Sequence, residues 1–254
     1  MSKNVEFDFK ATFLNLTQYT VPYEYEFTLR KYLPEGATED EHGNFCVTIG
    51  ESTTLFTSHL DTASLTCERV RHVINGDIIS TDESTILGGD NKAGVTILLY
   101  MISQGVPGTY YFFAGEELGL LGSKATLEEN ASRFYQFKRA ISFDGLGQGV
   151  LSAGREGEPF CSDKFANALA FQFCLQGVEY QPSIISKDIY TDSLLFTGHI
   201  PECTNLSSGV WNVHTTKEYV NIGLVEEIAR AATKVDWEGL PTLRLPEPVT
   251  YLAA

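Results

Sequence analysis

Short apolar runs that end in polar turns recur along this chain, and they alternate with stretches of helical spacing. Apolar runs bounded by Gly, Asn or Asp predict buried strands. We predict strands at residues 45–49, 54–57, 109–113, 139–143, 150–153 and 181–186, and helices at residues 23–32, 93–103, 123–137, 163–176, 191–196 and 220–235. Asn75-Gly76 at the centre of residues 71–80 predicts a hairpin with a tight turn. The alternation predicts an α/β fold, with helices on both faces of a mixed, largely parallel sheet.

The length of 254 residues suits one large α/β domain or two small ones. The interval from His59 to Asp90 is mostly the predicted hairpin, and predicted elements fill the interval from Asp144 to His214. Neither interval has room for a second domain. We therefore predict a single domain over residues 1–254, in which residues from about 240 onward form a surface tail.

The composition excludes several classes of partner. A formal net charge of −15 argues against nucleic acid, whose phosphates need a basic surface. No apolar stretch approaches the roughly 20 residues of a membrane span, and residues 1–8 lack the apolar segment of a secretory signal. The five cysteines, scattered and odd in number, are Cys46, Cys67, Cys161, Cys174 and Cys203. They predict reduced, buried thiols in a cytoplasmic protein.

Polar side chains recur where the predicted apolar runs end. The sites are His59-Leu60-Asp61, Gly88-Gly89-Asp90-Asn91-Lys92-Ala93-Gly94, Glu116-Glu117, Asp144-Gly145 and His214-Thr215. Because α/β sheets gather ligands at the carboxyl ends of their strands, we expect these side chains to meet. Histidines and carboxylates together suit zinc or a similar divalent ion, and a carboxylate between two cations can bridge them.

Each motif also has a structural interpretation. His59 could be a buried structural histidine, Asp90 an N-cap, and Asp144 a turn residue. Glu116 and Glu117 could form an acidic loop, but neighbouring residues point different ways, so one could hold a metal while the other moves a proton. The joint occurrence of the motifs, in order and at strand ends, favours a functional site.

Together these residues resemble the co-catalytic zinc exopeptidases, which include bacterial zinc aminopeptidases, tripeptidases and deacylases. The resemblance is carried by residues 59–61, 88–94, 114–123, 143–145 and 214–215, and it runs from about residue 54 to the final predicted helix. The segment 116–123 is closest to the single-domain aminopeptidases. Residues 90–94 are nearer the tripeptidases, whose inserted lid domain has no room here. The resemblance therefore implies the zinc-dependent exopeptidase fold without a lid domain.

The resemblance also implies two Zn²⁺ ions, with Co²⁺ or Mn²⁺ as alternatives. The implied ligands are His59 and Asp144 for one ion, Glu117 and His214 for the other, and Asp90 as the bridge. Asp61 would accept a hydrogen bond from His59 and set its tautomer. Glu116 would be the general base that moves a proton from water to the leaving amine.

Three further residues are candidates for substrate binding. Asp192 could bind the substrate amine, Tyr190 could donate to the oxyanion, and Arg155 could hold a substrate carboxylate. Their structural alternatives are a helix N-cap region, a packed tyrosine and a solvated loop arginine. The loop 205–209 could line the pocket that leads to His214.

The resulting hypothesis is a cytoplasmic di-zinc exopeptidase, an aminopeptidase that acts on short peptides. The first alternative keeps the site but changes the substrate, as in a deacylase, an amidohydrolase or a carboxypeptidase. A related single-zinc cyclase is less favoured because all five implied ligands are present. The second alternative is a metal-binding module without catalysis, and Glu116 speaks against it because metal binding alone does not need a base.

Overall fold

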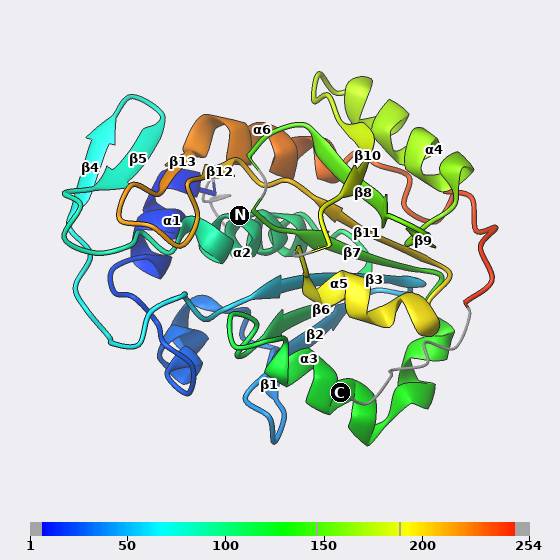
Figure 1. Ribbon diagram of the computed structural model, residues 1–254, viewed down its shortest axis with the longest axis horizontal. Coiled ribbons are helices and arrows are strands. Elements are labelled where there is room, and N and C mark those ends of the chain that lie inside the picture. Colours follow the sequence, from blue (N-terminus) through cyan, green and yellow to red (C-terminus); the bar gives the residue numbers. More distant parts are fainter. Residues whose placement is uncertain (1–6, 146, 188, 247–254) are drawn as a thin grey trace, which may run out of the picture.

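A mixed sheet forms the centre of the molecule (Figure 1). The computed structural model describes residues 7–145, 147–187 and 189–246. Within them, nine strands form this sheet in the order β1-β2-β6-β3-β7-β11-β8-β10, and β9 pairs with β8. The strands are β1 (Thr38–Glu39), β2 (Phe45–Ile49), β3 (Thr54–His59), β6 (Gly108–Phe113), β7 (Arg139–Phe143), β8 (Val150–Arg155), β9 (Glu158–Pro159), β10 (Gln181–Ile185) and β11 (Glu202–Leu206).

Parallel pairing at the centre of the sheet places the carboxyl ends of the central strands at the same edge. β3 is parallel to both β6 and β7, and β7 is parallel to β11. Antiparallel pairs lie further out, between β1 and β2, β2 and β6, and β8 and β11. The carboxyl ends of β6, β3, β7 and β11 therefore share one edge of the sheet. The predicted fold class, a mixed and largely parallel sheet in an α/β domain, is confirmed.

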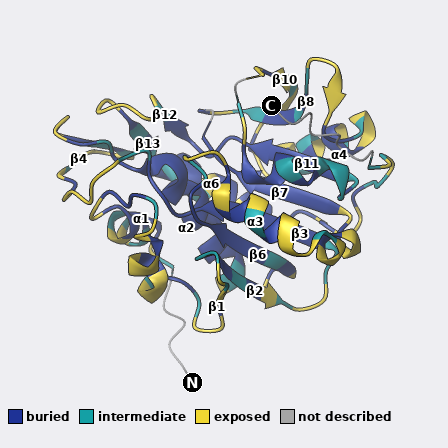
Figure 2. Cartoon of the chain, turned by 60° about the horizontal axis from the view of Figure 1, so that its bottom comes forward, coloured by how far each residue is buried: buried dark blue, intermediate teal, exposed yellow. Residues whose placement is uncertain are grey.

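Helices cover both faces of the sheet, as predicted. They are α1 (Phe9–Leu16), α2 (Gly89–Ser103), α3 (Leu121–Glu129), α4 (Asp163–Cys174), α5 (Asp192–Leu195) and α6 (Ile222–Ala232), with 3₁₀ segments η1 (Glu26–Tyr32), η2 (Ala131–Gln136) and η3 (Phe196–Gly198). β6 shows the two faces, because its consecutive residues Phe112 and Phe113 belong to two different apolar clusters. The cluster that contains Phe112 includes residues of α1, α2, α4 and α6, and the cluster that contains Phe113 includes residues of α3, α5, η2 and η3. Figure 2 shows the central strands as buried.

A smaller sheet lies beside the first and carries one of the predicted site loops. Among the described residues it has the order β12-β13-β5-β4, with β4 (His72–Asn75), β5 (Ile78–Thr81), β12 (Val210–Trp211) and β13 (Tyr219–Asn221). β4 and β5 form the hairpin predicted around Asn75-Gly76. The loop from β12 to β13 contains His214.

Several predicted elements need correction. Residues 23–32 form a 3₁₀ segment over Glu26–Tyr32, and the α-helix α1 before it was not predicted. The predicted helix 123–137 is divided at Asn130, whose φ of −154° and ψ of 76° end α3 before η2 begins. β11 was missed because Glu202, Thr204 and Asn205 are polar, although every position of this strand is buried.

The cysteine prediction is correct in part. All five thiols are free, and Cys161 and Cys203 are buried. Cys67 and Cys174, however, are exposed, because they lie in a loop and at the end of α4 rather than in the core. No helix among the described residues is long and apolar enough to cross a membrane.

The chain after α6 binds across the amino ends of the central strands. Arg139, fully buried at the start of β7, donates to Leu240 O and Thr242 Oγ1 and lies 3.5 Å from Glu238 Oε1. The Glu238 carboxylate also accepts hydrogen bonds from Ser52, Thr53 and Thr54. The part of the predicted tail that is described is therefore anchored. Residues 247–254 of that tail, and residues 1–6 of the predicted non-secretory start, lie outside the described residues.

Candidate metal centre

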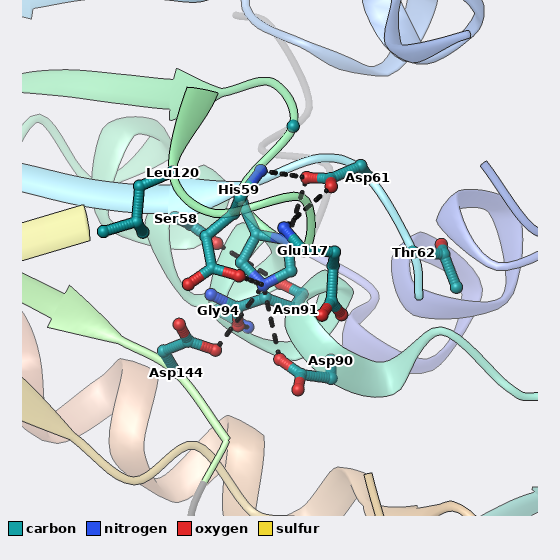
Figure 3. A network of polar contacts seen from close by, with 12 residues as sticks. Ser58, His59, Asp61, Thr62, Asp90, Asn91, Gly94, Glu117, Leu120 and Asp144 are labelled. Atoms are coloured by element: carbon teal, nitrogen blue, oxygen red, sulfur yellow. Dashed lines mark hydrogen bonds and ion pairs between the residues drawn. The ribbon is translucent and has the colours of Figure 1, made fainter. Parts of the chain in front are cut away.

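The predicted site residues meet at the carboxyl edge of the central strands. His59 is the last residue of β3, and Asp144 directly follows β7. Glu116 and Glu117 lie in the turn after β6, and Asp90 lies in the first turn of α2. Figure 3 shows the His59 ring between Asp61 on one side and Asp90 and Asp144 on the other. Parallel pairing of β6, β3 and β7 brings these turns together.

His59, Asp90 and Asp144 form a first group of possible metal ligands. His59 Nε2 lies 3.4 Å from Asp90 Oδ1 and 3.7 Å from Asp144 Oδ1. The same nitrogen lies 3.9 Å from Glu116 Oε2. His59 and Asp144 are both buried, one at the last position of β3 and the other directly after β7.

Asp90, Glu117 and His214 form a second group, which shares Asp90 with the first. His214 Nε2 lies 3.3 Å from Asp90 Oδ2 and 3.0 Å from Glu117 Oε2. The two oxygens of Asp90 therefore face different histidines. The His214 side chain is 51 % exposed, so the site reaches solvent on this side.

Asp61 holds the turn that carries the two glutamates. Its Oδ1 and Oδ2 accept hydrogen bonds from the backbone N–H groups of Glu116 and Glu117, each at 3.0 Å. Asp61 Oδ1 also lies 3.2 Å from His59 Nδ1. Asp61 thus fixes the glutamate turn and lies on the Nδ1 side of the His59 ring, away from Asp90 and Asp144, although this Nδ1 has no hydrogen-bond partner among the described residues.

The turn that carries Asp90 is built by its neighbours. Gly88, with a φ of 74°, precedes it, and the Asp90–Asn91 peptide bond is cis. Asn91 Oδ1 accepts from Gly94 N, so Asn91 rather than Asp90 caps the regular part of the helix. A Cβ on Gly94 would lie 2.0 Å from Phe143 O, so only glycine lets α2 begin this close to β7.

Several buried carboxylates lie close together in the site, and they raise one another's pKa values. Burial, together with Asp192 and Asp90 and opposed by His59, raises the pKa of Glu116 well above its usual range. Burial and the Asp90 carboxylate likewise raise the pKa of Asp144. Burial alone would lower the pKa of His59, but Glu116 and the other surrounding carboxylates raise it well above its ordinary value.

The pKa of Asp90 is lowered and that of His214 is raised, so both shifts favour the charged form of the group. Burial would raise the pKa of Asp90, but His214 and His59 lower it. Asp90 and Glu117 raise the pKa of His214 to about 10. A divalent cation held by these residues would take the place of protons on the two imidazoles, because metal ligands bind in their deprotonated form.

The residues fit a pair of divalent ions. Asp90 Oδ1 and Glu117 Oε1 are buried, and neither has a hydrogen-bond partner among the described residues. Two imidazoles and three carboxylates are a donor set that zinc, cobalt or manganese accepts. A third group, Glu41, His42 and Glu129, lies elsewhere on exposed or half-buried side chains.

Two charged residues next to the site were not among the candidates. Lys92 is fully buried, and its Nζ donates to Asp61 O and Thr62 Oγ1, each at 2.7 Å. Burial lowers the pKa of Lys92 to about 8. Glu218 is also buried, and its carboxylate binds the backbone of the Asp90 turn. Lys92 lies within the polar segment 88–94, whereas Glu218 is indicated in the sequence only by its position four residues after His214.

The three candidates for substrate binding lie in different surroundings: Asp192 is buried, whereas Arg155 and Tyr190 contact each other. Asp192 is buried, its Oδ1 has no hydrogen-bond partner, and its charge helps to raise the pKa of Glu116. Burial raises the pKa of Asp192 itself to about 7. Arg155 lies over the Tyr190 ring at 5.0 Å and forms an ion pair with Glu158 at 2.5 Å. Arg155 and Tyr190 therefore contact each other, and among the described residues neither forms an ion pair with the metal-ligand candidates.

Comparison with known proteins shows which of them are similar to this chain in sequence and in fold. No known family model matches the chain. A 108-residue alignment to the uncharacterised protein YqjE of Bacillus subtilis (strain 168) is 35% identical and covers 40% of this chain and 28% of that protein. The chain thus matches less than a third of the length of this relative.

Solved structures with the same arrangement cover nearly the whole chain. Aminopeptidase PepT from Bacillus cereus has a TM-score of 0.73 at 17% identity, over 91% of this chain and 97% of that one. A tripeptidase from Staphylococcus aureus has a TM-score of 0.71 at 18% identity, over 90% and 97%. An endoglucanase from Thermotoga maritima has a TM-score of 0.62 at 9% identity, over 89% and 97%. These similarities confirm, at the level of the fold, the resemblance seen in the motifs.

Proposed function

We propose that this chain is a two-metal exopeptidase, specifically an aminopeptidase that acts on short peptides. One observation carries the proposal: two groups of three possible ligands share Asp90, and Glu116 faces the same space. Aminopeptidases and tripeptidases among the proteins of the same fold support it. Because one fold hosts several activities, the site carries more weight than the fold.

In this proposal His59, Asp90 and Asp144 would hold one ion, and Asp90, Glu117 and His214 would hold a second, so that Asp90 would serve both. Bound divalent ions supply Lewis-acid activation of a carbonyl and of water. Zinc is the expected ion, and cobalt or manganese would suit the same donors.

Glu116 is proposed as the base. Its Oε2 lies 3.9 Å from His59 Nε2, so its carboxylate faces the ligands without being needed to complete either group. It would take a proton from the attacking water and deliver it to the leaving amine. Asp61 fixes the backbone of Glu116 and faces His59 Nδ1, so one carboxylate positions both the base and a ligand.

The charges around the site favour a substrate amine over a substrate carboxylate. No Arg or Lys among the described residues forms an ion pair with the carboxylates of the ligand groups or with Asp192. Lys92 is buried behind the site and binds Asp61 O and Thr62. Arg155 is engaged by Glu158. An ammonium group would find Asp192 unpaired, whereas a carboxypeptidase needs a cation for the substrate terminus.

Metal analysis combined with Glu116→Gln kinetics tests the proposal. We expect two zinc ions per chain in both proteins, and turnover of short peptides in the wild type alone. A panel of free and N-acetylated di- and tripeptides separates the alternatives, because an aminopeptidase requires the free amine. Cleavage of acylated substrates only would favour a deacylase. Undiminished activity of Glu116→Gln would rule out the proposed base.

A further inference from the structure

Glu218 is a buried carboxylate in the loop that carries His214. It lies four residues after His214, at the end of the loop from β12 to β13, and it is 1 % exposed. Its Oε2 accepts from Gly88 N and its Oε1 accepts from Asp90 N, each at 2.8 Å. One side chain therefore connects the His214 loop to the turn that carries Asp90.

Glu218 binds its turn as Asp61 binds the turn of the two glutamates. Each carboxylate uses both oxygens to accept two backbone N–H groups of a turn that carries candidate ligands. A carboxylate is suited to this task, because it accepts on both oxygens and has no donor that would face an N–H. The resemblance that assigned Asp61 gave no role to Glu218.

The residues around this contact are closely packed. A Cβ on Gly89 would lie 2.5 Å from Val220 Cγ2 and 3.4 Å from Glu218 Oε1. The Nζ of buried Lys92 donates to Asp61 O and to Thr62 Oγ1, each at 2.7 Å, so the backbone of Asp61 is held by a second buried side chain.

From this geometry we propose that Glu218 is a positioning residue for the second ligand group, formed by Asp90, Glu117 and His214. The inference rests on the proposed two-metal function. Glu218 fixes the backbone of Asp90 and the loop of His214, which are two of the three members of that group. The first group depends less on Glu218, because His59 and Asp144 are fixed by β3 and β7.

Zinc titration of the metal-free full chain by calorimetry tests the inference with Glu218→Gln. The glutamine amide keeps the size of the side chain but places an NH₂ against one of the two backbone N–H groups. We expect affinity for the second ion to fall about 10- to 100-fold, the range seen when an outer partner of a ligand is removed. Affinity for the first ion should fall less than affinity for the second, because Asp90 is the one member of the first group whose turn Glu218 binds, while His59 and Asp144 lie at the ends of β3 and β7. The cobalt absorption spectrum of the second site should change in parallel.

Glu202→Gln is the matched control. Glu202 is equally buried and accepts from Ser162 N, Leu243 N and Arg244 N, but it lies at the start of β11, away from the site. We expect Glu202→Gln to lower the thermal midpoint and leave both zinc affinities unchanged. Glu218→Asp carries the test if Glu218→Gln does not fold, because its shorter side chain cannot reach both N–H groups.

Wild-type affinities for both ions in a folded Glu218 variant would overturn the inference, and so would equal losses at both sites. A wild-type chain that binds fewer than two ions would instead overturn the proposed function. These outcomes separate a failure of the positioning role from a failure of the metal centre.

Discussion

The two ends of strand β7 present opposite electrostatic situations. At its amino end, Arg139 is paired with Glu238 and with acceptors of the C-terminal segment. At its carboxyl end, Asp144 faces Asp90 and the base candidate Glu116, and burial among these carboxylates raises the pKa of Asp144. The five-residue strand β7 thus connects a region where opposite charges of the chain are paired to a region where several carboxylates lie close together.

The difference assigns separate tasks to the two ends. Paired and hydrogen-bonded groups at the amino end need nothing from outside the chain, so they serve stability. Like charges at the carboxyl end raise the free energy of the metal-free fold, and a divalent cation would relieve this repulsion. The comparison therefore predicts that changes at one end affect catalysis and metal binding, while changes at the other affect stability alone.

Glu116→Gln should have the largest effect. Loss of a general base lowers kcat by about 10²- to 10⁴-fold, while zinc content should stay unchanged because Glu116 completes neither ligand group. The measurement is kcat on a tripeptide together with zinc per chain. Retention of most of the activity would contradict the assignment of catalysis to the carboxyl end of β7.

His214→Ala should act on metal binding instead. It removes a member of the second ligand group, so affinity for one zinc ion should fall by at least about 100-fold, the upper range for loss of an outer partner. Zinc titration measures this, and Lys217→Ala in the same exposed loop is the control. Equal zinc binding by His214→Ala and Lys217→Ala would remove His214 from the site.

Arg139→Met should show the reverse pattern. It removes a buried cation and its hydrogen bonds at the amino end, which costs about 1–3 kcal/mol of folding free energy. Denaturant unfolding measures the loss. Both zinc affinities and kcat should match the wild type, and a drop in zinc affinity would show that the two ends of the sheet are coupled.

Glu238→Gln gives the smallest effect, and it depends on pH. Hydrogen bonds from Ser52 and Thr53, with Arg139 nearby, lower the pKa of Glu238 from 4.5 to about 2. Because the folded-state pKa is lowered, the stabilisation is complete above about pH 4.5 and disappears as the pH falls towards 2. Its size should stay below about 1 kcal/mol, since the side chain is 45% exposed and solvent screens it.

Acid unfolding of both proteins measures this difference. The wild type should lose its advantage over Glu238→Gln between about pH 4.5 and 2. An advantage that instead grows with falling pH would contradict the lowered pKa.

The sequence predicted the carboxyl end better than the amino end. Apolar runs that stop at Asp144 or before Glu116 identify strand ends by local pattern, and parallel pairing then brings those ends together. The structure accordingly places all five implied ligands and Glu116 within one site. The contacts of Arg139 with Glu238 join residues 99 positions apart, calculated as 238 minus 139, and no spacing rule indicates such a pair.

What remained hidden in the site is non-local in the same way. Glu218 binds a turn that lies 128 residues away from it in the sequence, and β11 is buried although three of its five side chains are polar. The stacking of the Arg155 guanidinium on the Tyr190 ring, 35 positions further along the chain (190 minus 155), was likewise not indicated by the sequence pattern. Such assignments depend on tertiary contacts rather than on residue type.

Anomalous diffraction at the zinc absorption edge, from crystals of the full chain grown with zinc, tests the central claim most directly. We expect two peaks on either side of Asp90, one within about 2.0–2.2 Å of His59 and Asp144 and the other within the same distance of Glu117 and His214. A single peak, or zinc bound only at Glu41, His42 and Glu129, would contradict the two-metal centre.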